Sequence, residues 1–169
     1  MGDSLITIVA IFLAAILMFV FPLAAISEMN DNEALAIVQS YTTEFVNKIR
    51  TKGKITRQDY DEYIQKLYAT GNTYDVQFEV QIADANPGKK TENQQIGDMV
   101  YYSVYTSQVE DKLATGNYLL KEGDFVSVSV KNTNTTISQM IKNVLYSVTG
   151  DQSYVISAQA SGAVVTTGY

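Results

Sequence analysis

The sequence contains no histidine, no cysteine and no tryptophan. Without histidine and cysteine, a Ser-His-Asp triad, a cysteine nucleophile and the usual ligands of zinc, haem and iron–sulfur clusters are excluded. Disulfides are excluded as well, so an apolar core must stabilise the fold. Eighteen acidic and twelve basic residues give a formal net charge of -6, which argues against a general nucleic-acid-binding surface because such surfaces are basic.

Charge is also missing from the first long apolar segment, Leu5 to Ile26, in which only Thr7 and Pro22 are not apolar. About 20 such residues in a helix cross the ~30 Å hydrocarbon core of a bilayer. We therefore expect residues 1–27 to form a transmembrane anchor and residues 28–169 to form a domain outside the membrane. The positions expected to contact lipid or other subunits are Leu5, Ile8, Ala10, Phe12, Ala14, Ala15, Leu17, Phe19, Phe21 and Pro22.

Two other interpretations of this segment stay open. A cleaved signal peptide normally has a shorter apolar core that follows basic residues, but Ala25-Ile26-Ser27 offers a small-residue cleavage site. A buried helix of a soluble protein is the second interpretation.

The positive-inside rule gives no orientation, because the first lysine or arginine is Lys48. The Tyr-, Thr-, Ser- and Asn-rich remainder favours a domain outside the cell on a single-pass membrane protein.

A second helical pattern covers residues 31–52. Leu35, Val38, Phe45 and Ile49 lie on one stripe, with Thr42 within it and Val46 beside it, and Gly53 is a natural end. If residues 27–33 are also helical rather than a hinge, one helix of roughly 48 residues, or ~70 Å, joins the anchor to the domain. Pro22 is expected to kink it.

The remaining pattern predicts an α+β domain, with an antiparallel or mixed sheet of about four strands and two to three packed helices. Strand and helix periods alternate along the chain, separated by turn residues. The expected helices cover 56–70, 107–114 and 137–148, and the first has a capping-box-like start at Thr56, three residues before Asp59. The expected strands cover 74–82, 99–105, 125–130 and 154–165, with a possible bulge at Gly162, and the expected loops cover 84–98 and 131–136.

The charged residues form no recognisable active-site motif. The carboxylate pairs Asp59 with Glu62 and Glu110 with Asp111 are expected on solvated helix faces or helix starts. The basic residues of the 48–57 segment are interpreted as a solvated helix end, with contact to anionic lipid or a wall polymer as the alternative. They are Lys48, Arg50, Lys52, Lys54 and Arg57.

The tyrosines of the 56–70 helix also have two interpretations. Tyr60, Tyr63 and Tyr68 fall on one helical face together with Ile64 and Leu67. Core packing with the hydroxyls at the rim is the expected arrangement, and a binding surface is the alternative. We expect no catalytic residue, no cofactor and no metal site, and the chain is not expected to be an enzyme.

In the pattern of its first 52 residues, the chain resembles the type IV pilins and pseudopilins, especially minor pilin-like proteins of tight-adherence (Flp-type) pilus systems. The resemblance lies in a very short leader, Met1-Gly2, followed by the apolar helix 5–26 and the amphipathic helix 31–52. It implies cleavage after Gly2, a helix that anchors the subunit before assembly, and an α+β head. The leader has no basic residue, and Thr7 stands where the mature family helix carries an acid, which favours a minor, pilus-associated component.

This resemblance implies a non-catalytic structural or assembly protein. Its expected partners are membrane lipid and other pilin-like subunits or secretion machinery, with a homo-oligomer as a possibility and no nucleic acid. Assembly into a surface filament would place the apolar helix in a bundle, where small residues allow close approach. The alternative function is a single-pass cell-surface binding module with a tyrosine-rich head.

Overall fold

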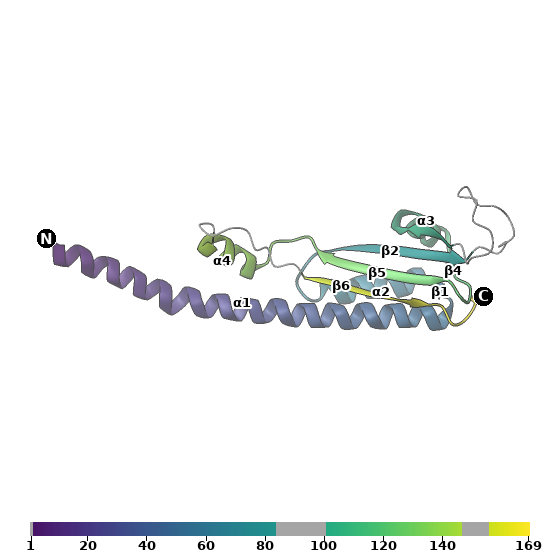
Figure 1. Cartoon of the computed structure of the whole chain (residues 1–169), viewed down its shortest axis with the longest axis horizontal. Coiled ribbons are helices and arrows are strands. Elements are labelled where there is room, and N and C mark those ends of the chain that lie inside the picture. The colour runs from purple at the N-terminus through teal and green to yellow at the C-terminus, as the bar shows by residue number, and fades with distance from the viewer. Residues whose placement is uncertain (1, 84–100, 147–155) are drawn as a thin grey trace. The chain divides into compact units, whose positions relative to one another are not determined.

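The computed structural model describes residues 2–83, 101–146 and 156–169. Helices and strands occur in the α+β combination that the sequence predicts. The expected loop at 84–98, the start of the strand at 99 and the residues around Gly150 and Tyr154 lie outside the described residues. The elements are α1 (Gly2–Lys52), β1 (Lys54–Ile55), α2 (Arg57–Tyr68), β2 (Tyr74–Ala83), β3 (Tyr101–Tyr105), α3 (Thr106–Thr115), β4 (Tyr118–Leu119), β5 (Phe125–Asn132), α4 (Ile137–Tyr146) and β6 (Ser157–Ala163) (Figure 1).

The chain divides into two compact units. The first contains Met1–Ala36 and Asn134–Ile156, and the second contains Ile37–Thr133 and Ser157–Tyr169. The first unit therefore holds the N-terminal part of α1 together with α4, and the second holds the rest of α1 and every strand. The expected division into residues 1–27 and 28–169 stays a prediction.

Helix α1 includes residues 27–33, so the polar segment after the apolar run is helix rather than hinge. The helix ends where the sequence predicts. The Gly53 N–H donates to the Ile49 carbonyl oxygen at 2.8 Å, and Gly53 has a φ of 66°. Glycine adopts this left-handed conformation at little cost, which makes it a common helix end. Pro22 lies inside the helix.

The main sheet has four strands in the order β3-β2-β5-β6, and every neighbouring pair is antiparallel. It is therefore antiparallel rather than mixed. The alternating pattern of β2 and β5 puts one face of each strand into the core: Val76 is opposite Val130, Phe78 opposite Val128, and Val80 opposite Val126.

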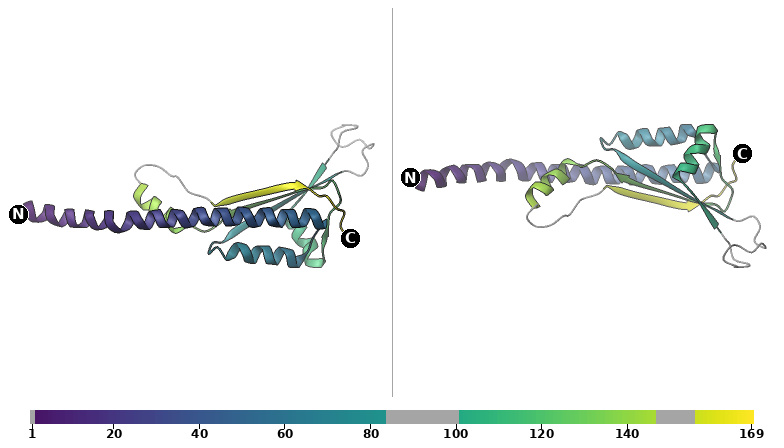
Figure 2. Two further views of the ribbon diagram at one scale, coloured as in Figure 1. Left: turned by 90° about the horizontal axis from the view of Figure 1, so that it is seen from below. Right: turned by 90° about the horizontal axis from the view of Figure 1, so that it is seen from above.

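The core of the second unit forms where this sheet face meets two helices. Figure 2 shows α2 side by side with the C-terminal part of α1. The predicted stripe of α1 is confirmed from Val38 onward, since Val38, Thr42, Phe45, Val46 and Ile49 are all buried. Leu35, its first predicted member, is only half-buried. In this core three aromatic rings from α1, α2 and β2 meet. Phe45 stacks on Tyr63 with ring centroids 4.2 Å apart and contacts Phe78 edge-on at 6.0 Å.

Helix α2 begins at the predicted cap. The Thr56 Oγ1 accepts a hydrogen bond from the Asp59 N–H at 3.1 Å, which satisfies one free N–H of the first turn. Of the predicted tyrosine face, Tyr63 is buried and Tyr60 is half-buried, but Tyr68 is exposed. Core packing is thus confirmed for Tyr63 and wrong for Tyr68.

Two short strands escaped the sequence analysis. β1 and β4 form a separate antiparallel pair in which Lys54 is opposite Leu119 and Ile55 is opposite Tyr118. Strands of two residues are too short for an alternating pattern to appear. They lie directly after α1 and α3, and they join the ends of these two helices.

The expected bulge at Gly162 is wrong. The β5–β6 register is continuous, with Val126 opposite Gly162 and Phe125 opposite Ala163. Gly162 instead leaves room for Arg50, whose guanidinium carbon would lie 2.6 Å from an added Cβ. The expected loop at 131–136 also begins later than predicted, because β5 continues to Asn132.

Side chains of α1 cover the outer edge of β6. Arg50 Nε donates to the Ala163 carbonyl oxygen at 2.6 Å, and Gln39 Nε2 donates to the Gln159 carbonyl oxygen at 3.1 Å. The Val165 N–H in turn donates to the Arg50 carbonyl oxygen at 3.1 Å. An open strand edge is a template for pairing with another chain, and α1 protects this edge from such pairing.

Candidate functional site

The apolar segment of α1 is the most unusual surface of the described chain. Apart from Val20, which is half-buried, its large apolar side chains are between 44% and 71% exposed. Every one of the ten positions expected to contact lipid or other subunits is exposed. A helix that is apolar all round requires an apolar environment. Among the described residues, this helix alone is long and apolar enough to cross a membrane.

This segment is compatible with a single-pass membrane anchor. Its fourteen Leu, Ile, Phe and Val residues favour insertion by at most about 0.3–0.6 kcal/mol each, or roughly 4–8 kcal/mol together. A signal sequence near the N-terminus also meets the criteria of length and composition that this helix meets. The buried helix of a soluble protein is disfavoured, because no residue of the most apolar window is buried in the described structure.

The apolar segment ends in a polar cluster within the first unit. Ser27 and Asp31 on α1 are buried, and Asp31 Oδ2 accepts a hydrogen bond from Thr136 Oγ1 at 2.7 Å. Glu28 forms an ion pair with Lys142 of α4, Nζ to Oε1, at 3.1 Å. These contacts hold α4 to α1 directly after the last apolar residue of the segment, Ile26.

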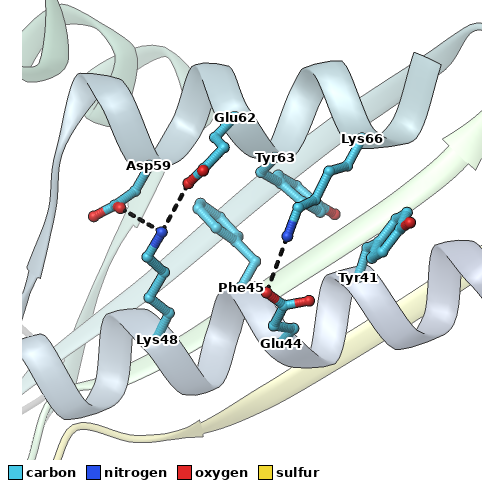
Figure 3. Close-up of a pocket in the computed structure, with 8 residues that line it drawn as sticks. All are labelled: Tyr41, Glu44, Phe45, Lys48, Asp59, Glu62, Tyr63 and Lys66. Atoms are coloured by element: carbon cyan, nitrogen blue, oxygen red, sulfur yellow. Dashed lines mark hydrogen bonds and ion pairs between the residues drawn. The ribbon is translucent and has the colours of Figure 1, made fainter. Parts of the chain in front are cut away.

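The C-terminal part of α1 carries a second group of charges, which lies against α2. Figure 3 shows Lys48 reaching from α1 to Asp59 and Glu62 of α2, at 2.7 Å and 2.9 Å. Lys52 Nζ also contacts Asp59, 3.0 Å from Oδ2. The cavity beside these residues has a volume of about 10 Å³, which is room for about one water molecule. It is too small for an organic substrate.

Asp59 is therefore a buried structural anion, which lies at the predicted helix start and not on a solvated helix face. Only 5% of the residue is exposed. Burial by itself raises the pKa of a carboxyl group, but hydrogen bonds from Lys48 and Lys52 overcome this effect and lower the pKa of Asp59 to about 2. The hydrogen bonds that Lys48 donates to Asp59 and Glu62 raise the pKa of Lys48.

The basic residues of the 48–57 segment are accordingly not a freely solvated helix end. Lys48 and Lys52 hold Asp59, Arg50 covers the β6 edge, and Arg57 pairs with Asp61 at 3.0 Å. Helix spacing alone did not reveal the contacts of Lys48 and Lys52 with Asp59, because these contacts join two different helices. The sequence did contain one signal for these contacts. Asp59 stands at the start of one helix and follows closely after Lys48 and Lys52, which stand at the end of the preceding helix.

Asp59→Asn is expected to lower the free energy of unfolding by about 2 kcal/mol at pH 7. The carboxyl pKa falls from 3.8 to about 2 on folding, and each pKa unit corresponds to ~1.4 kcal/mol. Because the folded-state pKa is the lower one, this stabilisation is present above about pH 4 and is lost as the pH falls toward 2. Urea unfolding of the full chain in detergent micelles at pH 7 and pH 3 measures both effects.

Asp61→Asn is the matched control. Asp61 pairs with Arg57 on the same helix, and both side chains are about half exposed, so its removal should cost under about 0.5 kcal/mol. Equal losses in the two variants, or a loss for Asp59→Asn that does not shrink at low pH, would contradict the assignment.

Within residues 2–83, 101–146 and 156–169 there is no group of three or more acidic side chains that could hold a metal ion. Glu110 accepts a hydrogen bond from the Tyr60 hydroxyl at 3.2 Å. Of the predicted carboxylate pairs, Asp59, Glu62 and Glu110 thus contact neighbouring side chains of the fold.

Comparisons with protein-family models, with curated protein sequences and with solved structures found no match to this chain.

Proposed function

We propose that this chain is a membrane-anchored, pilin-like structural or assembly protein without catalytic activity. Residues 5–26 lie in the bilayer, and the α+β part lies outside the cell. The observation that carries the proposal is the contrast within α1. Its N-terminal half exposes charge-free apolar side chains, while its C-terminal half buries Val38, Phe45 and Ile49 in the core of the second unit.

The same contrast between the two halves of α1 supports assembly into a filament. A charge-free helix leaves the bilayer at little cost only when another apolar environment replaces the lipid, and a bundle of such helices in a filament provides one. Ala10 and Ala14 are four residues apart, so they share one helix face on which a neighbouring helix can approach closely. The partners are then copies of this chain or pilin-like subunits with the same kind of helix.

A cleaved signal peptide fits less well. The candidate cleavage site Ala25-Ile26-Ser27 lies inside α1, and Ser27 is buried. Cleavage there would also separate the apolar segment from Glu28 and Asp31, which hold α4.

The mass of the mature chain tests the proposal. The chain is isolated from its native host, once from membranes and once from the fraction sheared off the cell surface. Cleavage after Gly2, giving a start at Asp3, together with recovery in both fractions is the expected result. A start near Glu28 would show a removed signal peptide and would contradict the anchor.

A cell-surface binding module is the second candidate. Three tyrosines of β3, at the edge of the main sheet, favour it, because Tyr101, Tyr102 and Tyr105 are all exposed. Exposed tyrosines provide a large apolar contact area with a polar tip. An intact Met1 and recovery from membranes alone would favour this function over filament assembly.

A further inference from the structure

Helix α4 has its two faces reversed relative to a helix of a soluble protein. Its apolar residues Ile137, Met140 and Val144 are 57%, 49% and 78% exposed, although they share one face of the helix. The polar residues Ser138 and Gln139 are only 2% and 8% exposed. Exposing the apolar face of α4 to water is unfavourable, because every apolar side chain that remains in water costs free energy.

The reversal is fixed by contacts inside the first unit. The Thr136 Oγ1 caps α4 by accepting a hydrogen bond from the Gln139 N–H at 3.2 Å, and the Thr136 N–H donates back to Gln139 Oε1 at 2.8 Å. This is a capping box. The same Thr136 hydroxyl donates to Asp31 of α1, and Lys142 pairs with Glu28. The polar side of α4 is thereby turned toward α1.

These contacts also set the depth of α4 relative to the apolar segment. Glu28 and Asp31 follow Ile26 by two and five residues, so they lie roughly 3 Å and 7.5 Å beyond it along the helix axis at 1.5 Å per residue. The headgroup layer on each side of a bilayer is about 5–7 Å thick. If residues 5–26 span the hydrocarbon core, α4 is attached at the level of the headgroups.

We propose that α4 is an interfacial helix that inserts Ile137, Met140 and Val144 into the outer surface of the bilayer beside the span of α1. The inference rests on the proposed membrane anchor. The occupant of the apolar face is lipid rather than another protein, because the attachment to Glu28 and Asp31 places α4 where lipid begins. Interfacial helices bury their apolar face about 5–10 Å into the boundary between headgroups and acyl chains.

This arrangement gives the polar side of α4 a defined role. An amphipathic helix on a free membrane surface turns its polar face to water, but here that face is occupied by the contacts to α1. Lys142 is the single charged residue of α4, and it is paired with Glu28. Binding should therefore not require anionic lipid, because the apolar contacts and not a basic face provide the attraction.

The absence of native cysteine permits a direct test with single-cysteine variants of the full chain. Leu17→Cys, Val144→Cys and Asn143→Cys each carry one environment-sensitive fluorophore. Asn143 is the matched control, because it neighbours Val144 and is exposed as well, but its side chain is polar. The proteins are reconstituted into phosphatidylcholine vesicles that contain lipid with a nitroxide either near the headgroup or near the end of the acyl chain.

The expected result is that the shallow nitroxide lowers the emission at position 144 about twofold or more, with a much smaller effect at position 143. At position 17 the deep nitroxide should be the stronger quencher. Quenching at 17 without quenching at 144 would overturn the interfacial helix and leave the anchor intact. Absence of quenching at 17 would overturn the anchor itself. A blue-shifted but unquenched emission at 144 would show a protein neighbour on this face and would overturn lipid as its occupant.

Discussion

Gly53→Ala is expected to lower the free energy of unfolding by roughly 2–5 kcal/mol. Two independent costs add. Gly53 has a φ of 66°, a left-handed conformation that costs a residue with a Cβ about 1–2 kcal/mol. An added Cβ would also fall 2.0 Å from the Thr166 carbonyl oxygen and 2.5 Å from the Gly168 nitrogen. Both atoms belong to the backbone, so the C-terminal segment must move, and overpacking of this kind typically costs 1–3 kcal/mol.

The position of Gly53 explains why this movement matters. The Gly53 carbonyl oxygen accepts a hydrogen bond from the Leu120 N–H at 2.8 Å, and the Gly168 N–H donates to the Leu120 carbonyl oxygen at 2.9 Å. The end of α1, the residue after β4 and the C-terminal segment therefore meet at one point. A displaced C-terminal segment loses its hydrogen bond to Leu120.

Gly71→Ala separates the two costs of the Gly53 variant. Gly71 also has a positive φ, 80°, but nothing lies within 4 Å of an added Cβ. Its replacement should cost only the conformational term, about 1–2 kcal/mol. Chemical unfolding of both variants, followed by circular dichroism of the full chain in detergent micelles, measures the difference. If Gly53→Ala is no more destabilising than Gly71→Ala, the close approach to Thr166 and Gly168 is not rigid.

Local periodicity was sufficient to predict most of the elements. The alternation of β2 and the buried stripe of α1 follow directly from which residues are apolar, because a strand repeats every two residues and a helix every 3.6. The helix end at Gly53 and the cap at Thr56 depend on single residues with strong positional preferences. These signals lie within a few residues of the structure that they specify.

The features that sequence analysis missed depend on contacts between distant residues. Thr136 bonds to Asp31 across 105 positions, and Lys142 bonds to Glu28 across 114. These contacts decide which face of α4 is turned toward α1, and the helical pattern of 137–148 contains no information about them. The burial of Asp59 likewise depends on how α2 packs against α1. Of the candidate functional site, the sequence predicted the apolar positions of α1 and missed the reversed helix beside them.

Replacement of Leu13 and Leu17 together by aspartate is expected to remove the chain from the membrane fraction. The two positions lie near the middle of the apolar segment and, four residues apart, on one face of α1. An aspartate at the centre of a spanning helix costs about 2.5–3.5 kcal/mol and replaces a leucine that contributes about 0.5 kcal/mol to insertion. Two replacements therefore cost roughly 6–8 kcal/mol, which cancels the roughly 4–8 kcal/mol that the apolar side chains provide. Aspartate is preferred to lysine because a short side chain cannot extend its charge to the membrane surface.

The double alanine variant at Leu13 and Leu17 provides the control, since it shortens the same side chains without adding charge and should stay with the membrane. Alkaline extraction of membranes, followed by quantification of the chain in the pellet and the supernatant, measures the outcome. The single Leu17→Asp variant should lie between the two, because a cost of about 3–4 kcal/mol leaves part of the insertion free energy in place. A double aspartate variant that remains in the pellet as fully as the parent would mean that residues 5–26 do not hold this protein in the bilayer.

The same result would also contradict the position of the membrane along α1 from which the depth of α4 is inferred. The double aspartate variant thus tests the premise that the filament and the interfacial helix share, and the fluorophore at position 144 tests only the second.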